Sequence, residues 1–346
     1  MKYLILFFAI LNGVAFSQVP HDSPNFEKHI LGQNDNRKAV ANNKKYPFSA
    51  VCRIEVFFPN GESAIGTGTL VAPNLVLTAA HVVYDLKRGG MAKCFVFPGY
   101  ENRTTPFGQS TSKEIWVTDE FKKDENTSYD IALITVEDNI GETAGWLGVR
   151  STNFSKQWSP WLRFLLGFPA DKDDTEVMYF NMGNIDSTSK KQYFYKFTTY
   201  SGMSGGPIFL DESGEYFIDG VHTGYCCGFN HSTRVNKSVV ERIGKNENCI
   251  SIYNNINIDS KPQVFYKMKE YDDFLNKSEA VVLSNISPKG ETVYIQSCIR
   301  KGYTSGNSTF FDEIDWVPFK VYPGRNYSIV KNVNSNCEGS YILKEY

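Results

Sequence analysis

The 346-residue sequence predicts an all-β fold, and three observations support this prediction. From residue 48 to about residue 258, short apolar and β-branched runs alternate with turn residues, as in β-sandwiches and β-barrels. The chain contains 25 Phe and 20 Tyr, and aromatic residues favour strands. One amphipathic helix stands out, because Asn236 can cap it and Val239, Val240 and Ile243 form an apolar face.

The first 17 residues have the pattern of a secretory signal peptide. Lys2 gives a positive start, residues 3–11 form an apolar run, and Ala15 and Ser17 are the small residues before the expected cleavage site. The run is too short for a membrane anchor, and no later stretch approaches about twenty apolar residues. We therefore expect a secreted, extracellular protein without a membrane span.

Residues 18–29 are polar and show no strand pattern. Lys28 precedes a short apolar start at Ile30, which favours a propeptide and hence a zymogen; a simple N-terminal arm is the alternative. The next domain is expected to span residues 30–258 and to end with the helix after Asn236. Its clearest predicted strands are 50–58, 64–71, 75–78, 131–136, 162–168 and 207–210.

A second β module is expected at residues 259–346, after a polar connector. Its strand-like runs, 280–283, 292–295, 319–322 and 327–330, suggest a small C-terminal β-sandwich. Aromatic residues such as Trp316 and Tyr322 suit core packing, and a glycan- or protein-binding face is the alternative.

Seven cysteines in a secreted chain favour disulfide bonds, with one thiol left over. The possible pairs are Cys52 with Cys94, Cys298 with Cys337, and Cys249 with Cys226 or Cys227. None of the spacings is typical of a zinc site, so we expect no metal and no cofactor. The net charge of −2 is spread along the chain, which argues against a nucleic-acid partner. Asn-x-Ser/Thr acceptors predict a glycoprotein in a host that glycosylates them, and they are Asn102, Asn126, Asn153, Asn230, Asn236, Asn276, Asn285, Asn307 and Asn326.

Three segments together carry the residue types of nucleophilic catalysis. His81 follows a strand through a small-residue turn, Asp130 directly precedes an apolar strand, and Ser204 is flanked by glycines that permit a tight turn. A serine hydroxyl needs a neighbouring base, and an imidazole can take and return that proton near neutral pH. A buried carboxylate orients the imidazole and stabilises its charged form.

These segments resemble those of the trypsin-like serine proteases. Residues 78–81 read T-A-A-H, residues 130–133 read D-I-A-L, and residues 202–207 read G-M-S-G-G-P. The gap from His81 to Asp130 is 49 residues, and the gap from Asp130 to Ser204 is 74 residues. The second gap is shorter than in digestive trypsins and resembles that of the V8-type glutamyl endopeptidases. The resemblance covers about residues 30–250.

The resemblance implies a double six-stranded β-barrel with a C-terminal helix and a cleft between the barrels. It also implies that protein or peptide substrates are cleaved, with Ser204 as the nucleophile, His81 as the general base and Asp130 as its orienting carboxylate. The N–H groups of Gly202 and Ser204 would form the oxyanion hole. The strand containing Thr223 and Gly224 would pair with the substrate backbone.

A preference for Glu, or Asp, at the P1 position follows from the same resemblance. Thr199 and His222 stand where glutamyl endopeptidases bind the substrate carboxylate, and position 198 is Thr rather than the acid of a trypsin. In that group the amine released by processing also helps to bind substrate, so cleavage near Lys28 would activate the enzyme. The alternative for His222 is a hydrogen-bonded core histidine.

Two other functions compete with an active endopeptidase. One is a catalytically inactive homologue that binds a partner, and the other is an adhesive glycoprotein that acts through its C-terminal module. Inactive homologues usually lose a triad residue or fill the oxyanion loop. This chain keeps His81, Asp130, Ser204 and the glycine-rich loop, which favours the enzyme.

Overall fold

The computed structural model describes the chain from residue 35 onward with several gaps. The described ranges are 35–151, 162–172, 176–212, 215–246, 249–254, 264–268, 271–275, 280–284, 291–305, 308–322, 325–331 and 341–345. The expected signal peptide, the expected propeptide and Cys337 lie outside these residues.

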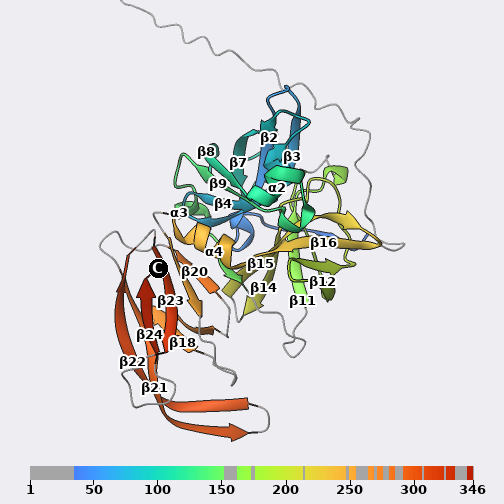
Figure 1. Ribbon diagram of the computed structural model, residues 1–346. Helices are drawn as coiled ribbons and strands as arrows, with labels where there is room; N and C mark the ends of the chain where they lie inside the picture. The colour runs from blue at the N-terminus through green and yellow to red at the C-terminus, as the bar shows by residue number, and fades with distance from the viewer. Residues whose placement is uncertain are drawn as a thin grey trace, which may run out of the picture.

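The first six-stranded barrel contains the strands predicted in the first third of the chain (Figure 1). Buried and less buried residues alternate along its first strand, where Ile54 and Val56 are fully buried and pack into the barrel core. The barrel closes in the order β2-β3-β4-β9-β8-β7. Its strands are β2 (Val51–Phe57), β3 (Ser63–Ala72), β4 (Leu75–Thr78), β7 (Lys93–Pro98), β8 (Ser110–Val117) and β9 (Ala132–Val136).

A second ring of six strands follows in the chain and confirms the double-barrel prediction. It runs β14-β11-β12-β13-β16-β15, and the pairing of β14 with β15 closes it. The strands are β11 (Leu162–Gly167), β12 (Tyr179–Thr188), β13 (Gln192–Tyr195), β14 (Pro207–Glu212), β15 (Glu215–Cys226) and β16 (Phe229–Arg234). The short strand β1 (Lys38–Ala39) adds to β12 and brings the described N-terminal residues onto this barrel.

The predicted helix is present as α4 (Lys237–Gly244), between the second barrel and the C-terminal strands. The side chain of Asn236 accepts a hydrogen bond from the Val239 N–H at 3.2 Å, which caps the helix. Val239, Val240 and Ile243 are fully buried, as their spacing predicts. The remaining helical segments are short and lie in connections, namely α1 (Ala80–Val83), α2 (Asp119–Asp124), α3 (Gly141–Ala144), η1 (Phe48–Ala50), η2 (Thr127–Tyr129) and η3 (Ala170–Lys172).

The C-terminal strands extend the sheet of the second barrel. Strand β10 (Gly148–Ser151) pairs in parallel with β15 and antiparallel with β20 (Ala280–Ser284). The sheet continues through β17 (Cys249–Asn254), β23 (Arg325–Lys331) and β24 (Tyr341–Glu345). Strand β17 therefore pairs with C-terminal strands, although it precedes the domain boundary expected at residue 258.

A separate four-stranded sheet completes the C-terminal region (Figure 1). Three of the four runs predicted there lie within strands of the two sheets, and the run 319–322 extends one residue past the end of β22 at Val321. The strand order of this four-stranded sheet is β19-β18-β21-β22. Its strands are β18 (Val264–Met268), β19 (Tyr271–Leu275), β21 (Glu291–Ser305) and β22 (Ser308–Val321). The small hairpin β5 (Tyr84–Asp85) and β6 (Gly90–Met91) lies in the first barrel's connections. Among the described helices, none is long and apolar enough to cross a membrane.

The free thiols of the structure include Cys52, Cys94, Cys226, Cys227 and Cys249. Cys94 lies opposite Val56, whereas Cys52 lies opposite Pro98, so the β2–β7 register separates this expected pair along the strand. Cys249 is buried, and Cys226 and Cys227 are exposed. The sequence-based pairing of Cys249 with either of these residues is therefore not formed.

Candidate active site

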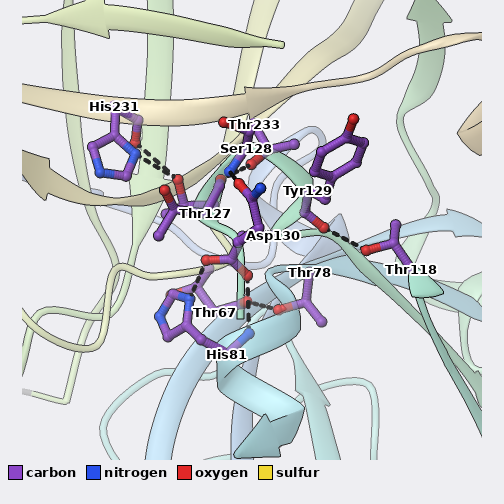
Figure 2. Close-up of polar contacts among 12 residues, drawn as sticks. Thr67, Thr78, His81, Thr118, Thr127, Ser128, Tyr129, Asp130, His231 and Thr233 are labelled. Carbon is purple, nitrogen blue, oxygen red and sulfur yellow. Dashed lines mark hydrogen bonds and ion pairs between the residues drawn. The ribbon is translucent and has the colours of Figure 1, made fainter. Parts of the chain in front are cut away.

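His81 and Asp130 meet because two strands of the first barrel lie side by side. Strand β4 leads into the short helix α1 that carries His81. Asp130 lies two residues before the start of β9, whose Ala132 pairs with Thr78 of β4. Asp130 Oδ2 lies 2.6 Å from His81 Nδ1, and Oδ1 accepts the backbone N–H of His81 at 2.9 Å (Figure 2). The carboxylate thus binds both the ring and the backbone of the same residue, which fixes the imidazole's orientation.

Burial differs sharply between the two partners. The Asp130 side chain is 2% exposed, whereas the His81 side chain is 38% exposed. Burial of the imidazole lowers its pKa, but the charge and the hydrogen bond of Asp130, with a smaller contribution from Asp85, raise the pKa of His81 above its usual value. The imidazole is therefore more basic than a free histidine and still accessible on one side.

The Asp130 loop is also tied to the second barrel. Thr118 Oγ1 donates to the Tyr129 carbonyl at 2.6 Å within the first barrel. The Thr127 carbonyl accepts from Thr233 Oγ1 of β16 at 3.1 Å and from Gln192 Nε2 of β13 at 3.3 Å. Figure 2 shows this loop between His81 and the strands of the second barrel.

The serine loop requires glycine at two positions. Gly202 and Gly205 have φ values of 90° and 86°, a region that other residues rarely adopt. A Cβ on Gly202 would overlap the Phe168 carbonyl, and one on Gly205 would overlap the Thr67 carbonyl and Thr78 Oγ1. The loop is closed by the Gly205 N–H, which donates to the His222 carbonyl at 2.8 Å.

Thr67 of β3 connects the serine loop to the first barrel, and the sequence analysis did not identify it. Its N–H donates to the Ser204 carbonyl at 2.8 Å, and its Oγ1 donates to the Gly202 carbonyl at 2.7 Å. Its own carbonyl accepts a hydrogen bond from Thr78 Oγ1 at 2.7 Å. Thr78 lies three residues before His81 in the chain. The segments that carry the expected base and nucleophile therefore meet at one fully buried residue. Its position between two glycines of a predicted strand is the only signal that the sequence contains.

Ser204 lies beside the His81 segment without a direct hydrogen bond to it. Gly66 lies between the two, because a Cβ built there would meet Val82 Cγ2 at 3.1 Å and the Ser204 carbonyl at 3.5 Å. Within the described residues, no hydrogen bond joins the Ser204 hydroxyl to His81, and the N–H groups of Gly202 and Ser204 have no protein acceptor. Such contacts commonly tighten only when substrate binds, and the two N–H groups remain available to an external oxygen.

The residues expected to bind a substrate carboxylate gather over β13, β15 and β16. Thr199 Oγ1 donates to Asn230 Oδ1 at 2.9 Å, and His222 Nδ1 lies 2.7 Å from the hydroxyl of Tyr195. Asn230 and Tyr195 are directly opposite in the β13–β16 pairing. The polar groups of Thr199 and His222 are therefore held by neighbouring residues, and the role of Tyr195 was not visible from the sequence.

Thr223 and Gly224 lie on β15 next to this cluster. A register shift occurs in the β15–β16 pairing between His222 and Gly224. Thr223 Oγ1 lies 2.9 Å from His231 Nδ1 of β16, a second histidine that the sequence analysis did not single out. No group of three or more His, Cys, Asp or Glu side chains in the described ranges is arranged to hold a metal ion.

Comparisons with known proteins agree with this geometry. The family described as the trypsin-like peptidase domain matches residues 66–217. The glutamyl endopeptidase of Bacillus licheniformis is 30% identical over 236 residues, which are 65% of this chain and 71% of the relative. This protein belongs to the trypsin-like serine peptidases, in the V8-type branch. It is a serine endopeptidase, and peptides are its substrates.

Two further relatives are similar to this peptidase. The solved structure titled "Structure of Glu endopeptidase in complex with MPD" has 29% identity and a TM-score of 0.54, and the match covers 62% of this chain and 97% of that one. A Bacillus subtilis protein named extracellular metalloprotease is 30% identical over 217 residues, 62% of this chain and 68% of the relative. That name disagrees with the serine-peptidase matches, and the assignment rests on the other comparisons.

Proposed function

We propose that this peptidase is a secreted enzyme that forms an acyl-enzyme on Ser204 and prefers Glu, or Asp, at P1. The contact between His81 Nδ1 and Asp130 Oδ2, 2.6 Å long and anchored by a buried carboxylate, carries the proposal. It leaves the other ring nitrogen of His81 for a proton from the hydroxyl of Ser204.

The mechanism follows from these roles. His81 takes the proton from the Ser204 hydroxyl as its oxygen attacks the substrate carbonyl, and Asp130 stabilises the resulting imidazolium. His81 then returns the proton to the leaving amine, and the peptide bond breaks to give an ester on Ser204. Water, activated by the same imidazole, hydrolyses the ester and regenerates the hydroxyl.

The N–H groups of Gly202 and Ser204 are proposed to bind the oxyanion. Thr67 supports this role, because it holds the carbonyl of each of these residues and so limits rotation of the loop. Loss of one such donor typically costs roughly 10²–10³ in kcat. The β15 backbone at Thr223 and Gly224 is proposed to pair with the extended substrate as an added strand.

Glu specificity is proposed from the cluster around Thr199 and His222. Both side chains are buried and are oriented by Asn230 and Tyr195. When a carboxylate binds, the Thr199 hydroxyl would turn its hydrogen from Asn230 Oδ1 to that group. No acid stands at position 198 to bind a basic P1 side chain. The names of the glutamyl endopeptidase relatives support the same preference.

Activation by removal of residues up to Lys28 is supported by the position of the described N-terminal residues. Arg37 is buried and pairs with Asp171 at 2.6–2.8 Å. Asn181 Nδ2 donates both to Asn36 Oδ1 at 2.8 Å and to the Thr198 carbonyl at 3.1 Å. Asn181 of β12 therefore connects Asn36 to the loop that carries Thr199. Asn36 lies seven residues after His29, the expected new N-terminus. Equal activity of processed and unprocessed protein would disprove this activation.

The decisive experiment is a peptide-library digest with the wild type and Ser204→Ala. We expect cleavage mainly after Glu by the wild type and none by the variant. Fluorophosphonate should label Ser204 alone. Cleavage mainly after Lys, Phe or Leu would refute the pocket assignment while leaving the nucleophile intact, and cleavage by the variant would refute the triad. Secretion is tested separately, by the N-terminal sequence of protein recovered from the medium.

A further inference from the structure

The hairpin that joins β15 to β16 has an unusual residue at its tip. Cys226 lies directly opposite Phe229, so the loop consists of Cys227 and Gly228. Their φ values are 56° and 84°, and two successive positive values are the mark of a type I′ turn. Asn-Gly is the favoured sequence for such a turn.

Turn geometry does not explain why Cys227 occupies this position. A residue with a Cβ is disfavoured at positive φ, and Asn, Asp or Gly would relieve the cost. Backbone outliers of this kind point to a function of the side chain that is retained there. The side chain of Cys227 does one specific thing in this structure, which is to place its sulfur against that of Cys226.

The two sulfur atoms lie 2.6 Å apart, closer than non-bonded sulfurs normally approach, and both cysteines are exposed. Three further thiols, those of Cys52, Cys94 and Cys249, are buried. A soluble oxidant therefore reaches this pair more readily than these three buried thiols. The pair also lies directly after Tyr225, at the end of the strand proposed to bind substrate.

We propose that Cys226 and Cys227 form a thiol-modification site, at which a small-molecule disulfide such as glutathione disulfide converts the two thiols into a disulfide between neighbouring residues. The thiolate of one cysteine attacks the oxidant, forms a mixed disulfide and releases one thiolate of the oxidant. The second cysteine then attacks the sulfur of the first and releases the other thiolate. Two protons leave the protein, and the oxidant takes up two electrons.

The consequence for catalysis rests on the proposed function of β15. A closed ring at the hairpin tip reduces the freedom of the backbone that follows Tyr225. A strand that is already ordered loses less entropy when a substrate pairs with it. Oxidation should therefore lower KM for substrates that extend along β15 by roughly two- to tenfold, with little change in kcat.

The first test is chemical and does not depend on peptidase activity. The full-length protein is incubated with glutathione disulfide, remaining thiols are alkylated with iodoacetamide, and the protein is digested for mass spectrometry. The proposal expects an unlabelled peptide that contains both cysteines and lacks two hydrogen atoms. Labelling of both residues, a stable glutathione adduct, or a link from either cysteine to Cys249 or another cysteine would overturn it.

A second test uses variants to connect the site to substrate binding. Cys227→Asn creates the preferred Asn-Gly turn and removes one sulfur, so it should fold while KM no longer responds to the oxidant. Cys249→Ser is the control and should keep the response. A response that persists in Cys227→Asn contradicts the site. If the disulfide forms without any change in KM, the chemistry stands and the proposed role of β15 is wrong.

Discussion

Single side chains in this peptidase act through the residues that orient them. The pKa of His81 shows this clearly. Burial of the imidazole lowers this pKa, but Asp130 and Asp85 together raise it by a larger amount. The net shift is upward, so the charged imidazole is favoured in the folded protein. General-base catalysis, however, requires the neutral imidazole.

The pH dependence of kcat/KM should reflect this shift. Activity should rise with pH as His81 loses its proton, and the midpoint of the acid limb should lie above the ordinary histidine value of about 6.5. Asp130→Asn should move the midpoint down and reduce kcat by roughly 10⁴. Hydrolysis rates measured between acid and neutral pH test this, and an unshifted acid limb in Asp130→Asn would contradict it.

Tyr195 should matter most for an acidic P1 side chain. Tyr195→Phe removes the hydroxyl that lies 2.7 Å from His222 Nδ1. Loss of a buried partner costs about 1–3 kcal/mol, so kcat/KM for P1 Glu peptides should fall about tenfold, with a smaller effect for P1 Gln.

Tyr193→Phe is the matched control on the same strand. Its hydroxyl lies 3.1 Å from the buried Asp219 carboxylate rather than from His222. This variant should lose stability without changing the Glu-to-Gln preference. An equal loss for Glu and Gln peptides in Tyr195→Phe would show that the tyrosine is merely structural.

Elements position the chemistry through tight turns rather than through long helices. The serine loop between β13 and β14 is the clearest case, because Gly202 and Gly205 combine positive φ with close backbone contacts. The element is therefore intolerant of a Cβ for two separate reasons, conformation and space.

Gly205→Ala should destroy the loop, whereas Gly61→Ala should not harm activity. Both glycines have φ near 90°, but Gly61 has nothing within 4 Å of a new Cβ. We expect a loss of about 3 kcal/mol or more for Gly205→Ala and about 1 kcal/mol for Gly61→Ala. Chemical denaturation measures the stability of the two variants, and fluorophosphonate labelling measures their active serine. Similar losses in the two variants would refute the steric argument.

At the scale of the whole molecule, the two barrels are held together where the site lies. Thr67 links β3 of the first barrel to Gly202 and Ser204 of the second. The Asp130 loop is linked to β13 and β16 through Thr127. Catalytic geometry thus depends on how the barrels dock.

Thr67→Val should therefore reduce catalysis with little change in shape. It removes the hydroxyl that donates to the Gly202 carbonyl and accepts the Phe168 N–H at 3.1 Å. Leaving such groups unpaired costs about 1–3 kcal/mol, and kcat should fall. Thr69→Val, on the same strand, is the control, because Thr69 Oγ1 has no partner among the described residues. Equal kcat in the two variants would contradict the role of Thr67.

The C-terminal strands should stabilise the peptidase domain rather than form an independent unit. Deletion of residues 260–346 removes β20 and leaves β10 and β17 without it as a partner. Calorimetry should show a melting temperature lower by more than about 4 °C. Deletion of only residues 341–346, which contain the edge strand β24, should have a smaller effect. An unchanged melting temperature after the long deletion would show that the two parts fold separately.

Much of the fold could be predicted because it depends on local patterns. The alternation along β2, the cap at Asn236 and the turn at Gly205 each express the preferences of a few neighbouring residues. The pairing of β17 could not be predicted, because β17 resembles any short strand and its partners, β20 and β23, lie far along the chain. The free state of Cys52 and Cys94 depends likewise on the β2–β7 register, which the cysteine count does not contain.

The sequence alone determined the residue types and their local settings: a histidine after a strand, an acid before one, and a serine between glycines. Only the tertiary structure decided which of them touch. It placed Asp130 on His81 through the pairing of β4 with β9, joined the serine loop to Thr67, and set Tyr195 behind His222. The physical reason is that these contacts depend on strand register and barrel closure between distant residues, whereas turns and caps depend on neighbours in the chain.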